Sequence, residues 1–284
     1  MDEVPLLFDL TPDTTLDFRG NPEINVRVTS KYKVRATLVL ACFADGSRLA
    51  PMLIFKEGNG QLPKKIQEAY DGTRIVLKAN KIGWMNKQSM QEWVDEVWVP
   101  VLKDDESYLL IYDSFVCHKD EQLMKSLLEN HLTEVAVIPG GCTSVLQPLD
   151  VGVNRPFKVK VKKSFQDWSV KKLLASSGNI FFIILKTYFS EITDTRSGYV
   201  RGPDREDLIK WVGDAWRDIS AETIIYAFQR AKLLENFREP QQNFLEGSEA
   251  ALRDLEEIEY DDPYLDDIQQ QFADTTELEM EGNN

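Results

Sequence analysis

Three aspartates stand where carboxylates can do metal or proton-transfer chemistry. Asp113 directly follows the apolar run 109–112, and ligands gather at the carboxyl ends of parallel strands in α/β sheets. Asp150 lies at the expected start of a helix, and Asp2 lies at the start of the first expected strand, with Asp9 as its nearest rival. Each acid also has a purely structural interpretation, since Asp113 can cap the next turn and Asp150 its helix. Taken singly, each acid leaves both interpretations open.

The elements that must position these acids are predicted from hydrophobic periodicity. Strands are expected over 4–10, 34–43, 50–55, 74–77, 107–112 and 134–138, with a hairpin turn at Asp45-Gly46. Helices are expected over 87–102, after Asp120, and over 151–175, 204–219 and 220–236. A hairpin followed by strand–helix alternation predicts an α/β fold, with a mixed sheet and helices packed on its faces.

In such a fold the three acids are expected to meet at one edge of the sheet. Three carboxylates there can hold two divalent ions about 3.5–4 Å apart, the geometry of in-line phosphoryl transfer. Mg²⁺ suits hard oxygen ligands and would activate a water or a 3′-hydroxyl, and Mn²⁺ is a natural substitute. Asp113, Asp150 and one acid of the first strand, Asp2 or Asp9, are therefore candidates for a group that binds divalent metal ions.

Longer motifs around these acids resemble a known family. Residues 1–5 (MDEVP), 112–118 (YDSFVCH) and above all 139–158 (PGGCTSVLQPLDVGVNRPFK) resemble the pogo/Tigger group of DDE transposases, as do 83–98 and 212–228. The resemblance covers roughly residues 1–235, and it extends to domesticated host proteins in the same group.

The resemblance implies an integrase-type, ribonuclease-H-like fold with Asp2, Asp113 and Asp150 as catalytic and metal-binding residues. It also implies Mg²⁺-dependent cleavage and strand joining on double-stranded DNA at transposon terminal repeats, in the nucleus. Three segments are expected: a catalytic core (1–175), a helical extension of that core (176–235) and an acidic, mostly disordered tail (236–284). Homodimer formation stays open.

One departure from the group concerns the start of the chain. Such transposases carry helix-turn-helix DNA-binding domains ahead of the catalytic core, whereas this chain opens on the first aspartate of the triad. We therefore expect a fragment, or an incomplete gene product, that lacks sequence-specific end recognition by itself.

The net charge of −14 argues at first against a nucleic-acid partner, because a polyanion repels phosphates. Residues 235–284, however, carry 16 acidic and two basic side chains, which leaves 31 of each sign in residues 1–234. The folded part is therefore neutral overall. Arg155, Lys158, Lys162 and Lys163 follow Asp150 on the expected helix and are candidate DNA contacts, with a solvated helix face as the alternative.

The composition of the chain narrows the classes of protein to which it can belong. No apolar run approaches the roughly 18 residues of a membrane span, and no secretory signal is visible. Three scattered cysteines suit a reducing compartment rather than a disulfide framework. Two functions remain: a two-metal DNA endonuclease or transposase-derived enzyme, and a catalytically silent domesticated nuclear protein that binds DNA or chromatin.

Overall fold

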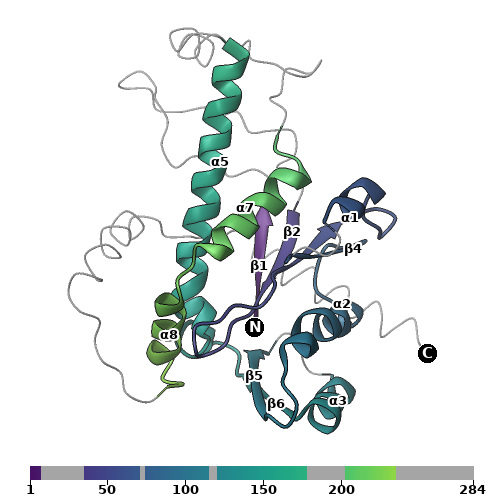
Figure 1. Ribbon diagram of the computed structural model, residues 1–284, viewed down its shortest axis with the longest axis vertical. Coiled ribbons are helices and arrows are strands. Elements are labelled where there is room, and N and C mark those ends of the chain that lie inside the picture. The colour runs from purple at the N-terminus through teal and green to yellow at the C-terminus, as the bar shows by residue number, and fades with distance from the viewer. Residues whose placement is uncertain (8–34, 71–73, 115–119, 178–201, 235–284) are drawn as a thin grey trace, which may run out of the picture. The chain divides into compact units, whose positions relative to one another are not determined.

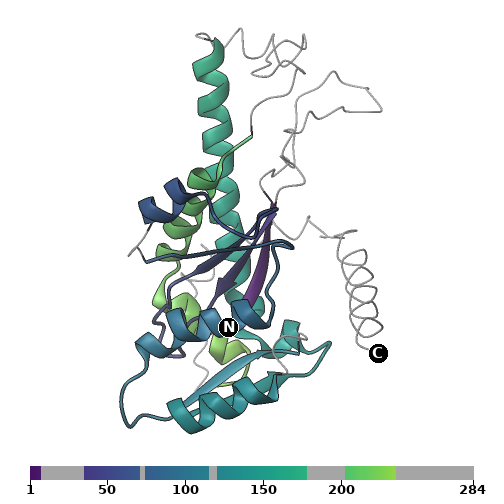
Figure 2. The same ribbon diagram turned by 90° about the vertical axis from the view of Figure 1, so that its right-hand side faces the viewer.

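The computed structural model describes residues 1–7, 35–70, 74–114, 120–177 and 202–234 (Figures 1 and 2). These residues fall within one unit, Met1–Asn236. The rival acid Asp9 and the predicted acidic tail lie outside the described residues. None of the described helices combines the length and the apolar character that crossing a bilayer requires.

The larger sheet has four strands in the order β1–β2–β3–β4. These are β1 (Asp2–Leu7), β2 (Arg35–Leu40), β3 (Met52–Lys56) and β4 (Val76–Asn80). β2 pairs antiparallel with β1 and β3, while β3 and β4 are parallel, so the sheet is mixed, as predicted. In this register Asp2 lies opposite Leu40 at the N-terminal end of β1.

The turn region between β2 and β3 begins at the predicted Asp45-Gly46 position. The Asp45 carboxylate accepts hydrogen bonds from the backbone and hydroxyl groups of Ser47, at 2.8 and 2.6 Å. Gly46 has φ +92°, and a Cβ there would come within 2.7 Å of the Ala221 Cβ. Glycine is therefore required twice, by the backbone conformation and by the close approach of the 220s helix.

Alternating side chains of β2 and β3 supply two separate apolar clusters, one on each face of the sheet. Leu38 and Leu53 join a cluster with helices α5 (Asn154–Ser177), α7 (Arg205–Arg217) and α8 (Ala221–Arg230). Val39 and Ile54 join a cluster with helices α2 (Lys87–Trp93) and α3 (Glu121–His131). Each such buried side chain contributes about 1.5–3 kcal/mol. Helices therefore cover both faces, as the sequence predicts (Figure 1).

A second, smaller sheet departs from the expected single one. β5 (Tyr108–Asp113) and β6 (Thr133–Ile138) pair in parallel with each other only, and α3 connects them. The backbone nitrogen of Met1, the residue before β1, donates to the Ile111 carbonyl of β5 at 2.8 Å. β5 therefore meets the N-terminal end of β1 and does not pair along its length. The two sheets consequently meet end to end near the N-terminus of β1 (Figure 2).

The helices match the predicted segments, with four differences, one of which is that α8 ends at Arg230 where the prediction runs to 236. Helix α1 (Lys64–Tyr70) was not expected, and α4 (Thr143–Leu146) lies in a predicted loop. The predicted helix 87–102 continues beyond α2 as a π-helical turn and then a 3₁₀ turn that contains Pro100. The segment ahead of α5 is also π-helical, over Leu149–Val153. Inserted π turns often occur at functional sites, and this one carries Asp150.

Candidate metal centre

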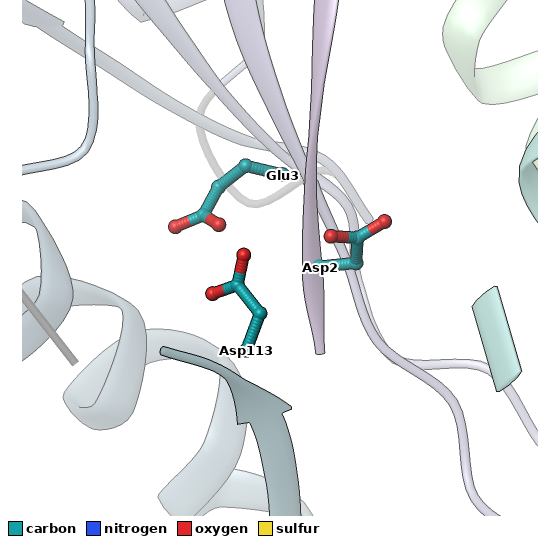
Figure 3. A group of neighbouring side chains, drawn as sticks. All are labelled: Asp2, Glu3 and Asp113. Atoms are coloured by element: carbon teal, nitrogen blue, oxygen red, sulfur yellow. The ribbon is translucent and has the colours of Figure 1, made fainter. Parts of the chain in front are cut away.

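Asp2, Glu3 and Asp113 bring their carboxylates together where β1 meets β5 (Figure 3). One oxygen atom from each of the three side chains lies within 4.8 Å of the others. Asp2 is only 6% exposed, whereas Glu3 and Asp113 are half-buried. The structure therefore brings together two of the three aspartates that the sequence selects.

Glu3 is a member of this group that sequence reasoning missed. Neighbouring residues of a strand point to opposite faces of the sheet. Once Asp2 is selected as a metal ligand, Glu3 is therefore expected to point to the opposite face. In Figure 3 the carboxylates of Glu3 and Asp113 lie on one side of β1, and that of Asp2 lies on the other. Because the cluster forms at the end of the strand, both faces can contribute. Two consecutive acids at a strand start would have been the available signal.

The third predicted aspartate reaches Asp2 through an intermediate side chain. The Asn154 amide nitrogen donates to the Asp2 carboxylate at 2.5 Å and to the Asp150 carboxylate at 2.9 Å. Asn154 is 6% exposed, while Asp150 is exposed. Asp150 lies in the first turn of the π-helical segment, where its charge suits the helix dipole, although the N-cap position itself is Pro148. The structural interpretation of Asp150 therefore stays open beside the metal-binding one.

The π-helical turn that carries Asp150 is fixed by a close approach to α8. A Cβ on Gly152 would lie 2.8 Å from the Ala227 Cβ and 3.2 Å from its Cα, so only glycine allows this packing. Leu149 and Val153 are buried in the cluster beneath the same turn. The position of Asp150 relative to β1 is therefore set by packing on both sides of the turn.

The electrostatics of the cluster favour a positive ligand. The pKa of Asp2 is raised to about 7, chiefly by burial and secondly by the charge of Asp150, while the hydrogen bond from Asn154 opposes the rise. Gathered carboxylate oxygens are the donor set that hard divalent cations prefer. The unpartnered, buried Oδ1 of Asn154 also fits a hydrated cation, because the waters of its hydration shell can donate to it. These residues fit a divalent metal ion.

The predicted DNA-contacting residues lie on the first half of α5. Lys158 and Lys163 are exposed, and Arg155 and Lys162 are partly buried. Arg155, Lys158 and Lys162 are three and four residues apart, so they share one face of the helix. That face begins at Arg155, the residue after Asn154.

This geometry, an acidic group at a strand end followed by a basic helix, agrees with the family comparison. Residues 33–228 match the model of the DDE superfamily endonucleases, and the chain belongs to this family. Its curated relatives include pogo transposable element proteins, so the chain is a pogo-type, transposase-derived DDE domain.

Several curated relatives indicate the kinds of protein in which such a domain occurs. The mouse protein "Pogo transposable element with KRAB domain" is 29% identical over 244 residues, which are 84% of this chain and 35% of that protein. "CENP-B homolog protein 2" of Schizosaccharomyces pombe is 23% identical over 243 residues, 83% of this chain and 41% of that protein. Mouse "Jerky protein" is 27% identical over 166 residues, 55% of this chain and 28% of that protein. The chain thus spans well under half of the length of these relatives. No solved structure matches it.

Proposed function

We propose that this chain is the ribonuclease-H-like catalytic core of a DDE endonuclease that cleaves DNA phosphodiesters and joins strands with two divalent ions, Mg²⁺ in the cell. Asp2, Asp113 and Asp150 hold the ions, and Glu3 lies within reach of the same site. The observation that carries the proposal is that one carboxylate oxygen each of Asp2, Glu3 and Asp113 lies within 4.8 Å of the others. Asp150 is linked to Asp2 by hydrogen bonds from Asn154.

The roles of the chain's own residues follow from their positions. The carboxylates supply negative charge at the junction of β1 and β5, and divalent ions bound there supply Lewis-acid activation of the attacking oxygen and stabilise the leaving oxygen. Arg155, Lys158, Lys162 and Lys163 bind backbone phosphates beside the acids and hold the DNA in register, without reading its sequence. Sequence recognition would then come from another domain.

The wider proposal follows the expected organisation of the family. We assign 1–175 to the catalytic core, 176–235 to its helical extension and 236–284 to an acidic tail. Double-stranded DNA with transposon terminal repeats would be the substrate, a helix-turn-helix domain the module that recognises it, and the nucleus the compartment.

Nicking of supercoiled plasmid DNA tests the proposal, first with the 284-residue chain and then with the chain fused behind a helix-turn-helix domain and its DNA site. We expect nicking that requires Mg²⁺ or Mn²⁺ and is lost in Asp113→Asn and Asp150→Asn. The matched control is Asp95→Asn, which changes an exposed acid on the π-helical turn after α2 that does not belong to the acidic group. Equal nicking by all four proteins would mean that another nuclease is being measured.

A second function is favoured by the relatives' names, which join a pogo element to a KRAB or a ZNF domain. In this alternative the domain is a domesticated, catalytically silent module that binds DNA or chromatin. This function would be favoured over the first if the fused protein binds DNA in a salt-sensitive manner but shows no metal-dependent nicking under the conditions of the nicking assay.

A further inference from the structure

We propose that Asn154 is a positioning residue that sets the distance and orientation between Asp2 and Asp150 for metal binding. The inference deepens the proposed function and depends on it. Its basis is a buried amide that bridges two acidic side chains 148 positions apart in sequence, one on β1 and one on the π-helical turn before α5.

The chemistry of the three groups dictates how the amide is oriented. An ionised carboxylate only accepts hydrogen bonds, so the Asn154 nitrogen, and not its oxygen, must face both acids. The amide nitrogen carries two hydrogens, and its two carboxylate partners, at 2.5 and 2.9 Å, use one each. Each carboxylate keeps further lone pairs for a cation.

A neutral donor suits this position better than a charged one. A lysine or arginine between the acids would neutralise them and compete with a cation for the same oxygens. The amide instead holds two like-charged groups close together without cancelling their charge. The repulsion between the two carboxylates falls when a cation binds, so the bridge holds both acids in position for the metal.

The location of Asn154 makes this orientation rigid. It is the first residue of α5, four positions after Asp150, and it is 6% exposed. Its neighbour Val153 is fully buried beneath the same turn. A short side chain in this setting has few alternative rotamers. Removal of the Asn154 amide would leave the exposed Asp150 side chain without a link to Asp2.

Manganese binding by the 284-residue chain tests the role, with free Mn²⁺ followed by its electron paramagnetic resonance signal. Partners that orient metal ligands typically change affinity by about 10–100-fold when they are removed. We expect Asn154→Leu to weaken Mn²⁺ binding by that factor. Asn154→Ser, a smaller change that cannot span both acids, should weaken it by at least about tenfold.

Val161→Ala is the matched control, since it disturbs the buried packing of α5 two turns after Asn154 and leaves both the bridge and the 149–153 turn intact. We expect it to lower the melting temperature in EDTA while the Mn²⁺ dissociation constant stays within about twofold of wild type. Comparable loss of affinity in Val161→Ala would show that metal binding only follows fold stability and would overturn the inference.

The remaining outcomes separate this inference from the proposed function. Wild-type Mn²⁺ affinity in Asn154→Leu or Asn154→Ser overturns the role of Asn154 and leaves the proposed metal centre in place. Absence of Mn²⁺ binding by the wild-type chain overturns both. Weak binding in the two Asn154 variants, with normal binding in Val161→Ala, supports the bridge.

Discussion

Replacing Asp2 with asparagine should change how the stability of the metal-free protein depends on pH. The pKa of Asp2 rises from an ordinary value of 3.8 to about 7 in the folded protein, chiefly because the carboxyl is buried and secondly because of the charge of Asp150. The folded state therefore binds a proton more tightly than the unfolded state does. Its contribution to stability is fully present below pH 4 and is lost as the pH rises towards 7.

The size of this effect follows from the difference between the two pKa values. About three pKa units, at about 1.4 kcal/mol each, correspond to about 4 kcal/mol of unfolding free energy lost between pH 4 and pH 8. Asp2→Asn cannot ionise, so it does not lose this amount. The hydrogen bonds of the new amide add a constant offset that does not depend on pH. The change of the difference with pH therefore reports the Asp2 carboxyl together with its coupling to the Met1 amino group.

Urea unfolding in EDTA at several pH values between 4 and 8 measures this difference. Acids with lowered pKa, such as Asp45 and Asp120, act in the opposite direction in both proteins and cancel in the comparison. Mn²⁺ at pH 8 should restore most of the lost stability to the wild type and less to Asp2→Asn. A free-energy difference between the two proteins that stays constant from pH 4 to 8 would refute the reasoning.

Three further predictions concern packing, thiol reactivity and DNA. Gly152→Ala should lower the free energy of unfolding by about 1–3 kcal/mol and weaken Mn²⁺ binding, since its Cβ would lie 2.8 Å from that of Ala227; unchanged urea midpoints would argue against this packing. Burial raises the pKa of Cys42 to about 11. In a Cys117→Ser, Cys142→Ser variant, iodoacetamide at pH 8 should therefore alkylate Cys42 roughly a hundredfold more slowly than free cysteine. An equal rate would contradict the burial of this thiol. Lys158→Ala should reduce the slope of log affinity against log salt for plasmid DNA by about one, with Lys125→Ala on α3 as the unaffected control.

The fold could be predicted from the sequence wherever one face of an element is apolar. The alternation in β2 and β3 and the periodicity of α7 gave strands and a helix close to the observed bounds, whereas α8 starts as predicted but ends six residues early. Helix α1 escaped because only Ile66 of its seven residues is buried, which leaves no periodic pattern to detect. The separation of β5 and β6 from the larger sheet escaped as well, since periodicity does not report where strands overlap.

The candidate site shows the same division between local and tertiary information. Asp113 could be selected because it follows an apolar strand, a feature visible within a few residues. Glu3 and Asn154 could not, because their contributions depend on where β1 ends against β5 and on how the π-helical turn approaches β1. The motif 139–158 contains both Gln147 and Asn154, yet nothing in its spacing states which polar side chain meets which acid.

The packing of the 149–154 segment explains how an exposed acid can belong to a buried site. Asp150 itself is exposed, but Leu149 and Val153 on either side of it are buried, and Gly152 lets the turn lie against Ala227. The turn is therefore held by apolar contacts, while Asn154 links its one charged member to the interior. An acid fixed in this way stays accessible to solvent on one side and linked to Asp2 on the other, as the proposed metal centre needs.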